Sequence, residues 1–149
     1  MLKKNIKSKI LKLKKIYLKD NFLVIFRDLK LNLSRGEIYF SYFNNLKIKN
    51  WKRNNKSTQN FFVVKGEIKF LIFNEINKKR LIFRLKEKDN FVLSIPPRNW
   101  YSFKPIVKKS ILFNQLNLSK DKSKKYDVKF AKKYTYLNKL WKKNLIDTN

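Results

Sequence analysis

The stretch that decides the fold is residues 36–75, GEIYFSYFNNLKIKNWKRNNKSTQNFFVVKGEIKFLIFNE, together with residues 91–103, FVLSIPPRNWYSF. In both pieces, short runs of apolar and β-branched residues are separated by Asn-rich, Pro-rich or Gly-containing breaks, a pattern typical of β-strands joined by turns. Outward from them, the same pattern continues to residue 116. We therefore predict strands at residues 37–43, 60–64, 67–73, 80–85, 91–95 and 110–116.

The two ends of the chain show different patterns. Near the start, ILKLKKIYL and FLVIF alternate around the turn residues 19–21, which predicts a first hairpin. Near the end, apolar residues recur every three or four positions and predict an amphipathic helix over about residues 126–146. The apolar residues of this stripe are Tyr126, Phe130, Tyr134, Leu137, Trp141 and Leu145. Such a stripe packs on the strands or binds a partner.

Composition limits the possible functions. The 149 residues are 43% hydrophobic and carry no Pro/Gly/Ser-rich linker, which predicts a single domain over residues 1–149. The chain has no cysteine and no histidine, so we expect no disulfide, no metal and no other cofactor. Its apolar runs are too short for a membrane span, and we expect a cytoplasmic protein. The net charge of +28 favours anionic partners, although codons of an A/T-rich genome also explain a lysine excess.

Three ordered motifs, EIYFS, NFFVVKGEIKF and IPPRNW, carry a resemblance to a known family. In this order they resemble the cupin-type dTDP-4-dehydrorhamnose 3,5-epimerases and the related sugar-nucleotide ketoisomerases. The resemblance implies an all-β, cupin-type jelly-roll barrel over about residues 10–118, followed by the C-terminal amphipathic helix. It also implies a homodimer, a nucleotide-sugar or other phosphate-bearing ligand, and a role in polysaccharide biosynthesis.

At the positions that the resemblance aligns with the family's metal-binding and catalytic residues, this sequence has other residues. The two histidines of the first cupin segment fall on Lys52 and Asn54, and its acidic or amide residue falls on Gln59. The histidine of the second segment falls on Tyr101, and a family glycine falls on Arg98. The catalytic base of the epimerases would be Lys52, and the position of their tyrosine acid lies near Phe113. We therefore assign no catalytic residue.

The same alignment gives a set of candidate ligand contacts. These residues are Lys49, Lys52, Arg53, Gln59, Tyr101 and Asn114. Lysine at position 49 keeps the charge of a family arginine but not its two-pronged geometry. For each of the six, the alternative is that the residue fills the barrel interior or is solvated.

Three functions remain open at this stage. The first is a sugar-nucleotide epimerase-like cupin with little or no activity, and the second is a pseudoenzyme in a polysaccharide-assembly complex. The third is a basic RNA-binding or ribonucleoprotein-associated β protein, in which aromatic residues among the lysines stack on bases. The stacking candidates are Tyr39, Trp51, Phe61 and Phe62, and the alternative is that they belong to the core.

Overall fold

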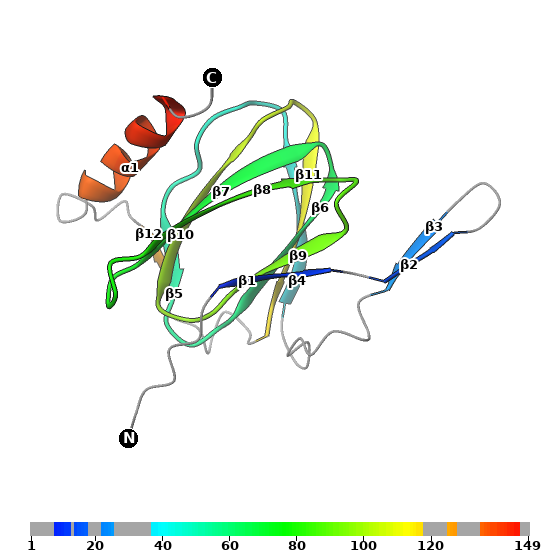
Figure 1. Cartoon of the computed structure of the whole chain (residues 1–149), viewed down its shortest axis with the longest axis horizontal. Helices are drawn as coiled ribbons and strands as arrows, with labels where there is room; N and C mark the ends of the chain where they lie inside the picture. Colours follow the sequence, from blue (N-terminus) through cyan, green and yellow to red (C-terminus); the bar gives the residue numbers. More distant parts are fainter. Residues whose placement is uncertain are drawn as a thin grey trace.

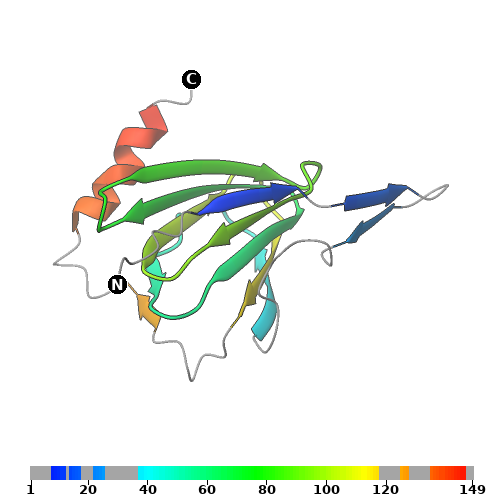
Figure 2. The ribbon, with the colours of Figure 1, turned by 60° about the horizontal axis from the view of Figure 1, so that its bottom comes forward.

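The computed structural model describes residues 8–12, 14–17, 22–25, 37–117, 125–127 and 135–146. Two five-stranded antiparallel sheets face each other, and a separate two-stranded hairpin projects from them (Figure 1; Figure 2). The first sheet has the order β1 (Lys9–Lys12), β9 (Phe91–Ile95), β6 (Gln59–Lys65), β11 (Ser110–Leu116) and β4 (Glu37–Phe43). The second has the order β12 (Lys125–Asp127), β5 (Lys52–Asn54), β10 (Asn99–Pro105), β7 (Glu67–Asn74) and β8 (Arg80–Lys86).

This arrangement confirms the predicted all-β, cupin-type jelly roll with one C-terminal helix, α1 (Thr135–Ile146). The six strands predicted from residue 37 onward are present with bounds that differ by at most one residue. Three further strands, β5, β10 and β12, were not predicted. The helix was predicted to begin near Tyr126, but Tyr126 lies in β12 and pairs with Arg53 of β5. The predicted stripe residues 130 and 134 lie outside the described residues.

The predicted N-terminal hairpin is correct only in part. β2 (Lys14–Tyr17) and β3 (Phe22–Ile25) pair with each other as expected. β1 does not join them, because it pairs with β9 and forms an edge of the first sheet. The predicted turn at residues 19–21 lies outside the described residues.

The core fills the space between the two sheets. Because side chains alternate along a strand, every second residue of each strand points into this space. Aromatic rings meet there, with Phe61 of β6 at 5.2 Å from Phe70 of β7 and at 5.4 Å from Tyr101 of β10. The other buried members are Phe43, Val63, Ile68, Ile72, Leu85, Leu93, Ile95 and Leu112.

A second apolar cluster lies on the outer face of the second sheet, where α1 packs. Leu137 and Trp141 of the helix are buried against Leu71, Phe73 and Trp100 of the sheet and against Trp51. The helix therefore covers the sheet, as the first of the two alternatives for its apolar stripe requires. Within the described residues, no helix is both long enough and apolar enough to cross a membrane.

Candidate ligand-binding site

A cavity of about 60 Å³ lies between the two sheets, near the edge where β4 and β5 face each other. Residues of both sheets line it: Tyr39, Ser41, Phe61, Leu112 and Asn114 from the first, and Lys52, Tyr101 and Phe103 from the second. Three of the six predicted ligand contacts, Lys52, Tyr101 and Asn114, therefore come together in one place.

Strand register explains why these side chains meet. Lys52 of β5 pairs directly with Tyr101 of β10, so both side chains point to the same face of the second sheet. In the first sheet, Asn114 of β11 lies between its partners Tyr39 of β4 and Phe61 of β6. The ring of Phe61 packs edge-on against Tyr101 and joins the two groups across the core.

The polar groups of the cavity are well suited to binding oxygen-rich ligands. They are the Lys52 ammonium, the hydroxyl groups of Tyr39, Ser41 and Tyr101, and the amide of Asn114. An ammonium group only donates hydrogen bonds, and no carboxylate is among the described lining residues. By volume, the cavity holds about two water molecules. A phosphate group or one edge of a sugar fits, whereas a complete nucleotide does not.

Lys49 lies beside this cavity without lining it. Its Nζ atom is 5.0 Å from the centre of the Phe43 ring, and that ring packs edge-on against Phe103 of the cavity wall. The backbone of Lys49 is fixed, since its N–H donates to Phe103 O at 2.9 Å and its carbonyl accepts from the Ser102 hydroxyl at 2.5 Å. Lys49 thus places a positive charge next to the cavity.

Arg53 does not face the cavity. It follows Lys52 in β5, so its side chain points to the outer face of the second sheet. There it forms an ion pair with Glu75 at 2.7 Å and lies over the Trp100 ring at 4.9 Å. Glu75 also accepts a hydrogen bond from Trp100 Nε1 at 2.7 Å. The arrangement holds β5, β10 and the end of β7 together, which gives Arg53 a structural role.

Gln59 is buried next to the cavity but is not part of its lining. It lies two residues before Phe61 on the same face of β6, and it pairs with Leu116 and Ile95 of the neighbouring strands. Within the described residues, neither amide atom of Gln59 has a hydrogen-bond partner, and the same holds for both amide atoms of Asn54 and for Oδ1 of Asn114. Buried amides of this kind typically bind ordered water or a polar ligand, because leaving them unpaired costs about 1–3 kcal/mol each.

Sequence reasoning missed Ser41 as a site residue and considered Tyr39 only as a stacking candidate. The alternation along β4 could have identified both residues, because Tyr39 and Ser41 share one face of the strand with the buried Phe43. The stacking hypothesis is not supported for two of its four residues. Trp51 and Phe61 are core residues with 1% of their surface exposed, and neither is accessible to a base.

No metal centre is evident in the parts of the chain that the structure describes. Residues 8–12, 14–17, 22–25, 37–117, 125–127 and 135–146 contain no group of three or more His, Cys, Asp or Glu side chains placed to hold an ion. The four positions aligned with the cupin metal ligands carry Lys52, Asn54, Gln59 and Tyr101. An ammonium group cannot ligate a metal, and the other three are poor ligands without an anionic or imidazole companion.

Comparison with known proteins identifies the fold. No protein-family model matches the sequence, and no curated protein matches it. Among solved structures, a dTDP sugar isomerase from Desulfovibrio desulfuricans is similar, with a TM-score of 0.70, 24% identity, and coverage of 80% of this chain and 82% of its own. A TDP-fucose-3,4-ketoisomerase from Campylobacter jejuni has a TM-score of 0.64, 23% identity, and coverage of 74% of this chain and 82% of its own.

The epimerases are represented as well. A dTDP-4-dehydrorhamnose 3,5-epimerase from Bacillus anthracis, solved with TDP and pyrophosphate bound, has a TM-score of 0.67, 16% identity, and coverage of 78% of this chain and 75% of its own. At these identities the likeness establishes the fold. It confirms that the chain is built like the sugar-nucleotide epimerases and ketoisomerases, as the three motifs indicated.

Proposed function

We propose that this protein binds a sugar nucleotide at the cavity between β4 and β5 and has little or no epimerase activity. The observation that supports this most is that Lys52, Tyr101 and Asn114 meet in one cavity of a fold shared with TDP-sugar isomerases. Because the cavity is small, one edge of the sugar enters it and the diphosphate stays at its mouth. There the Lys49 and Lys52 ammonium groups supply positive charge.

The proposed lack of activity follows from the chemistry of the lining. Epimerisation next to a keto group begins with removal of a proton from carbon, which needs a base within hydrogen-bond reach. The described residues around the cavity offer hydroxyl groups, an amide and an ammonium, and they include no carboxylate and no imidazole to act as the base. We therefore expect binding without turnover.

Calorimetric titration with dTDP tests the binding. We expect affinity to fall about tenfold or more between 50 and 300 mM NaCl, since lysine charges at an open mouth are screened by salt. Lys52→Gln should weaken binding, while the matched variant Lys56→Gln, which removes an exposed lysine from the loop after β5, should not. Equal effects of the two variants, or tight binding of RNA with no binding of dTDP, would contradict the proposal.

Deuterium exchange tests the absence of turnover. A dTDP-4-keto-6-deoxy sugar is incubated with the protein in heavy water, and uptake at sugar carbons 3 and 5 is followed by NMR. We expect no uptake above the rate without protein at pH 7. If the wild-type protein promotes uptake and Lys52→Met abolishes it, Lys52 is the base and the proposed lack of activity is wrong.

We also propose that the protein forms a homodimer through the outer face of the first sheet. Ile38, Phe40 and Tyr42 of β4 are 63%, 51% and 71% exposed, and Val64 of β6 is exposed on the same face. Phe40 packs edge-on against Phe113 of β11 at 5.6 Å, which extends the apolar surface. An exposed apolar surface on one sheet face is typical of a protein interface.

Light scattering coupled to gel filtration measures this association. Phe40→Glu places a charge within the apolar face and should shift the protein to the monomer mass. Ile82→Glu is the control, because Ile82 is similarly exposed on the outer face of the second sheet. A wild-type monomer at 50 µM, or equal effects of both substitutions, would exclude this interface.

A further inference from the structure

A second and larger cavity, of about 220 Å³, lies on the opposite side of the molecule from the first. It is bordered by β8, the outermost strand of the second sheet, and by Ser8, which immediately precedes the edge strand β1 of the first sheet. The first cavity lies toward the other side of the sheets, where β4 and β5 contribute to its lining. The two cavities share no lining residue.

The walls of this second cavity are apolar. Ile72 of β7 pairs with Leu81 of β8, and Phe83 lies two residues further along β8, so all three side chains share the inner face of the second sheet. Phe83 is partly buried and packs against the core. An engineered cavity of about 150 Å³ with such walls binds benzene. The volume here accommodates an aromatic ring with one substituent.

The asparagines at the rim are occupied by the turn that joins β7 to β8. Asn74 Oδ1 accepts from the backbone N–H groups of Ile76 and Asn77 at 2.9 and 3.3 Å, and Asn77 Oδ1 accepts from Lys79 N at 3.0 Å. Asn74 Nδ2 donates to Asn99 Oδ1 at 3.0 Å. The oxygens of these amides are therefore used to fix the rim.

Ser8 and Lys79 supply hydrogen-bond donors at the cavity. The hydroxyl oxygen of Ser8 is buried and has no partner within the described residues. The Lys79 ammonium is exposed at the rim, and both side-chain ion pairs found among the described residues involve arginine instead. The lining residues include no carboxylate. Apolar walls with a cation and a hydroxyl donor at the opening are complementary to an anion that carries an apolar body.

We propose that this cavity is a second ligand site, which binds a small carboxylate with a compact apolar body of about the size of one aromatic ring. The ring lies against Ile72, Leu81 and Phe83, and the carboxylate accepts from Lys79 and from the hydroxyl of Ser8. This site is independent of sugar-nucleotide binding, because it lies at the other open side of the sheets. The carboxylate would act as a regulatory ligand or as a substrate, and the first cavity is too small to hold it.

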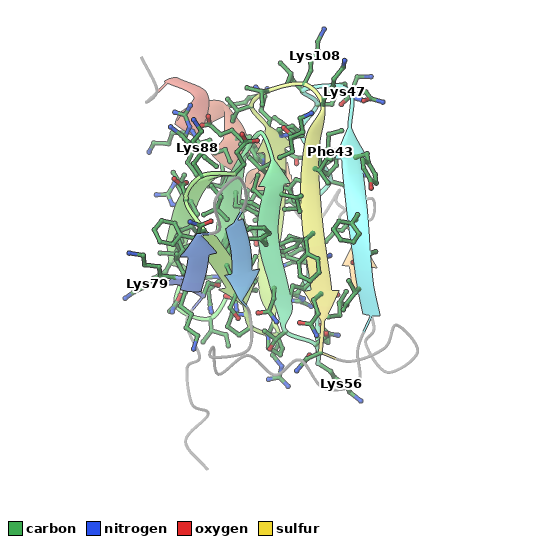
Figure 3. The ribbon with its side chains drawn as sticks, turned by 90° about the vertical axis from the view of Figure 1, so that its right-hand side faces the viewer. Phe43, Lys47, Lys56, Lys79, Lys88 and Lys108 are labelled. Atoms are coloured by element: carbon green, nitrogen blue, oxygen red, sulfur yellow. The ribbon has the colours of Figure 1, made fainter. Side chains whose placement is uncertain are left out.

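Fluorine NMR of 4-fluorobenzoate with the full chain in 150 mM NaCl tests this proposal, with 4-fluorobenzamide as the neutral analogue. We expect the benzoate to bind at least fivefold more tightly than the benzamide. Lys79→Gln should weaken benzoate binding about fivefold, and Lys88→Gln should leave it within twofold. Both variants lower the net charge by the same amount, and the two lysines lie at opposite ends of the sheets (Figure 3).

Leu81→Trp, which fills the cavity, should abolish binding, and its circular-dichroism spectrum shows whether the fold is kept. If Leu81→Trp does not fold, the benzoate affinities of Lys79→Gln and Lys88→Gln decide whether the proposal holds. No binding, equal binding of the neutral analogue, equal effects of the two lysine variants, or displacement of the benzoate by dTDP would each overturn the proposal.

Discussion

Gly66 and Arg98 adopt the same left-handed backbone conformation in two different turns. Gly66 joins β6 to β7 with a φ of +82°, and Arg98 joins β9 to β10 with a φ of +67°. Glycine adopts this region without steric cost, whereas a residue with a Cβ pays about 1–2 kcal/mol. At Arg98, the strained turn is held by a hydrogen bond of 2.7 Å from its N–H to Asn54 O. The family motif has glycine at this position.

We expect Gly66→Ala and Arg98→Gly to have opposite effects on stability. A Cβ at position 66 would approach Val107 Cγ2 at 2.9 Å and come closer still to Ser110, so Gly66→Ala should lower the free energy of unfolding by about 2–3 kcal/mol. Arg98→Gly removes backbone strain from the folded state but also gives the unfolded chain more conformational freedom. The net effect should be a rise of about 0.5 kcal/mol in the free energy of unfolding. Urea denaturation measures both. A loss on Arg98→Gly would show that the arginine side chain stabilises the turn.

Single residues also show what the sequence could predict of the site. Lys52 and Tyr101 were identified by their positions in the motifs, and both line the cavity between the sheets. Arg53 was predicted to contact the ligand together with Lys52, yet adjacent residues of a strand point to opposite faces. Strand β5 has only three residues, which is too short for a visible alternation, so its face pattern was not readable from the sequence.

At the level of elements, sequence analysis missed β10, a strand with buried residues on both faces. In β10, Trp100 and Ser102 face the helix, while Tyr101 and Phe103 face the core. A strand covered on both sides has no polar–apolar alternation, which is the signal used to predict strands. The β12 strand was missed for another reason, because Tyr126 fits the spacing of the following helical stripe.

The packing of α1 depends on a buried serine. Ser102 Oγ of β10 accepts from Trp141 Nε1 at 2.9 Å and donates to Lys49 O at 2.5 Å, so one hydroxyl joins the helix, the sheet and the segment before β5. Ser102 and Trp141 are both buried. A substitution that removes the hydroxyl leaves two buried polar groups without a partner.

We expect Ser102→Ala to lower the free energy of unfolding by about 2–3 kcal/mol, because the Trp141 N–H and the Lys49 carbonyl lose their partner together. Trp141→Phe removes the donor and some packing. The double variant should be less destabilised than the sum of the single variants, by about 1 kcal/mol, since both act on the same hydrogen bond. Thermal and urea unfolding measure this coupling. Strict additivity would mean that the hydrogen bond contributes nothing to helix docking.

On the scale of the whole molecule, positive charge is distributed over both ends of the sheets. Lys47, Lys88 and Lys108 lie at one end, and Lys56 and Lys79 lie toward the other (Figure 3). The chain contains 38 basic and 10 acidic residues, so most of its cations have no acidic residue to pair with. Self-repulsion between like charges favours the expanded, unfolded state. The apolar core and the aromatic contacts between the sheets therefore stabilise the fold against its own charge.

We expect the protein to become more stable as salt is added. Between 20 and 300 mM NaCl, the Debye length falls from about 20 Å to about 6 Å, and repulsion between distant lysines is largely screened. We expect this screening to raise the free energy of unfolding by about 1–2 kcal/mol. For a chain of this size, that corresponds to a rise in melting temperature of about 3–8 °C. The rise should level off above about 0.5 M NaCl, because further salt adds little screening. Calorimetry at five salt concentrations measures this. A melting temperature that falls with salt would show that attractive ion pairs outweigh the repulsion expected from a net charge of +28.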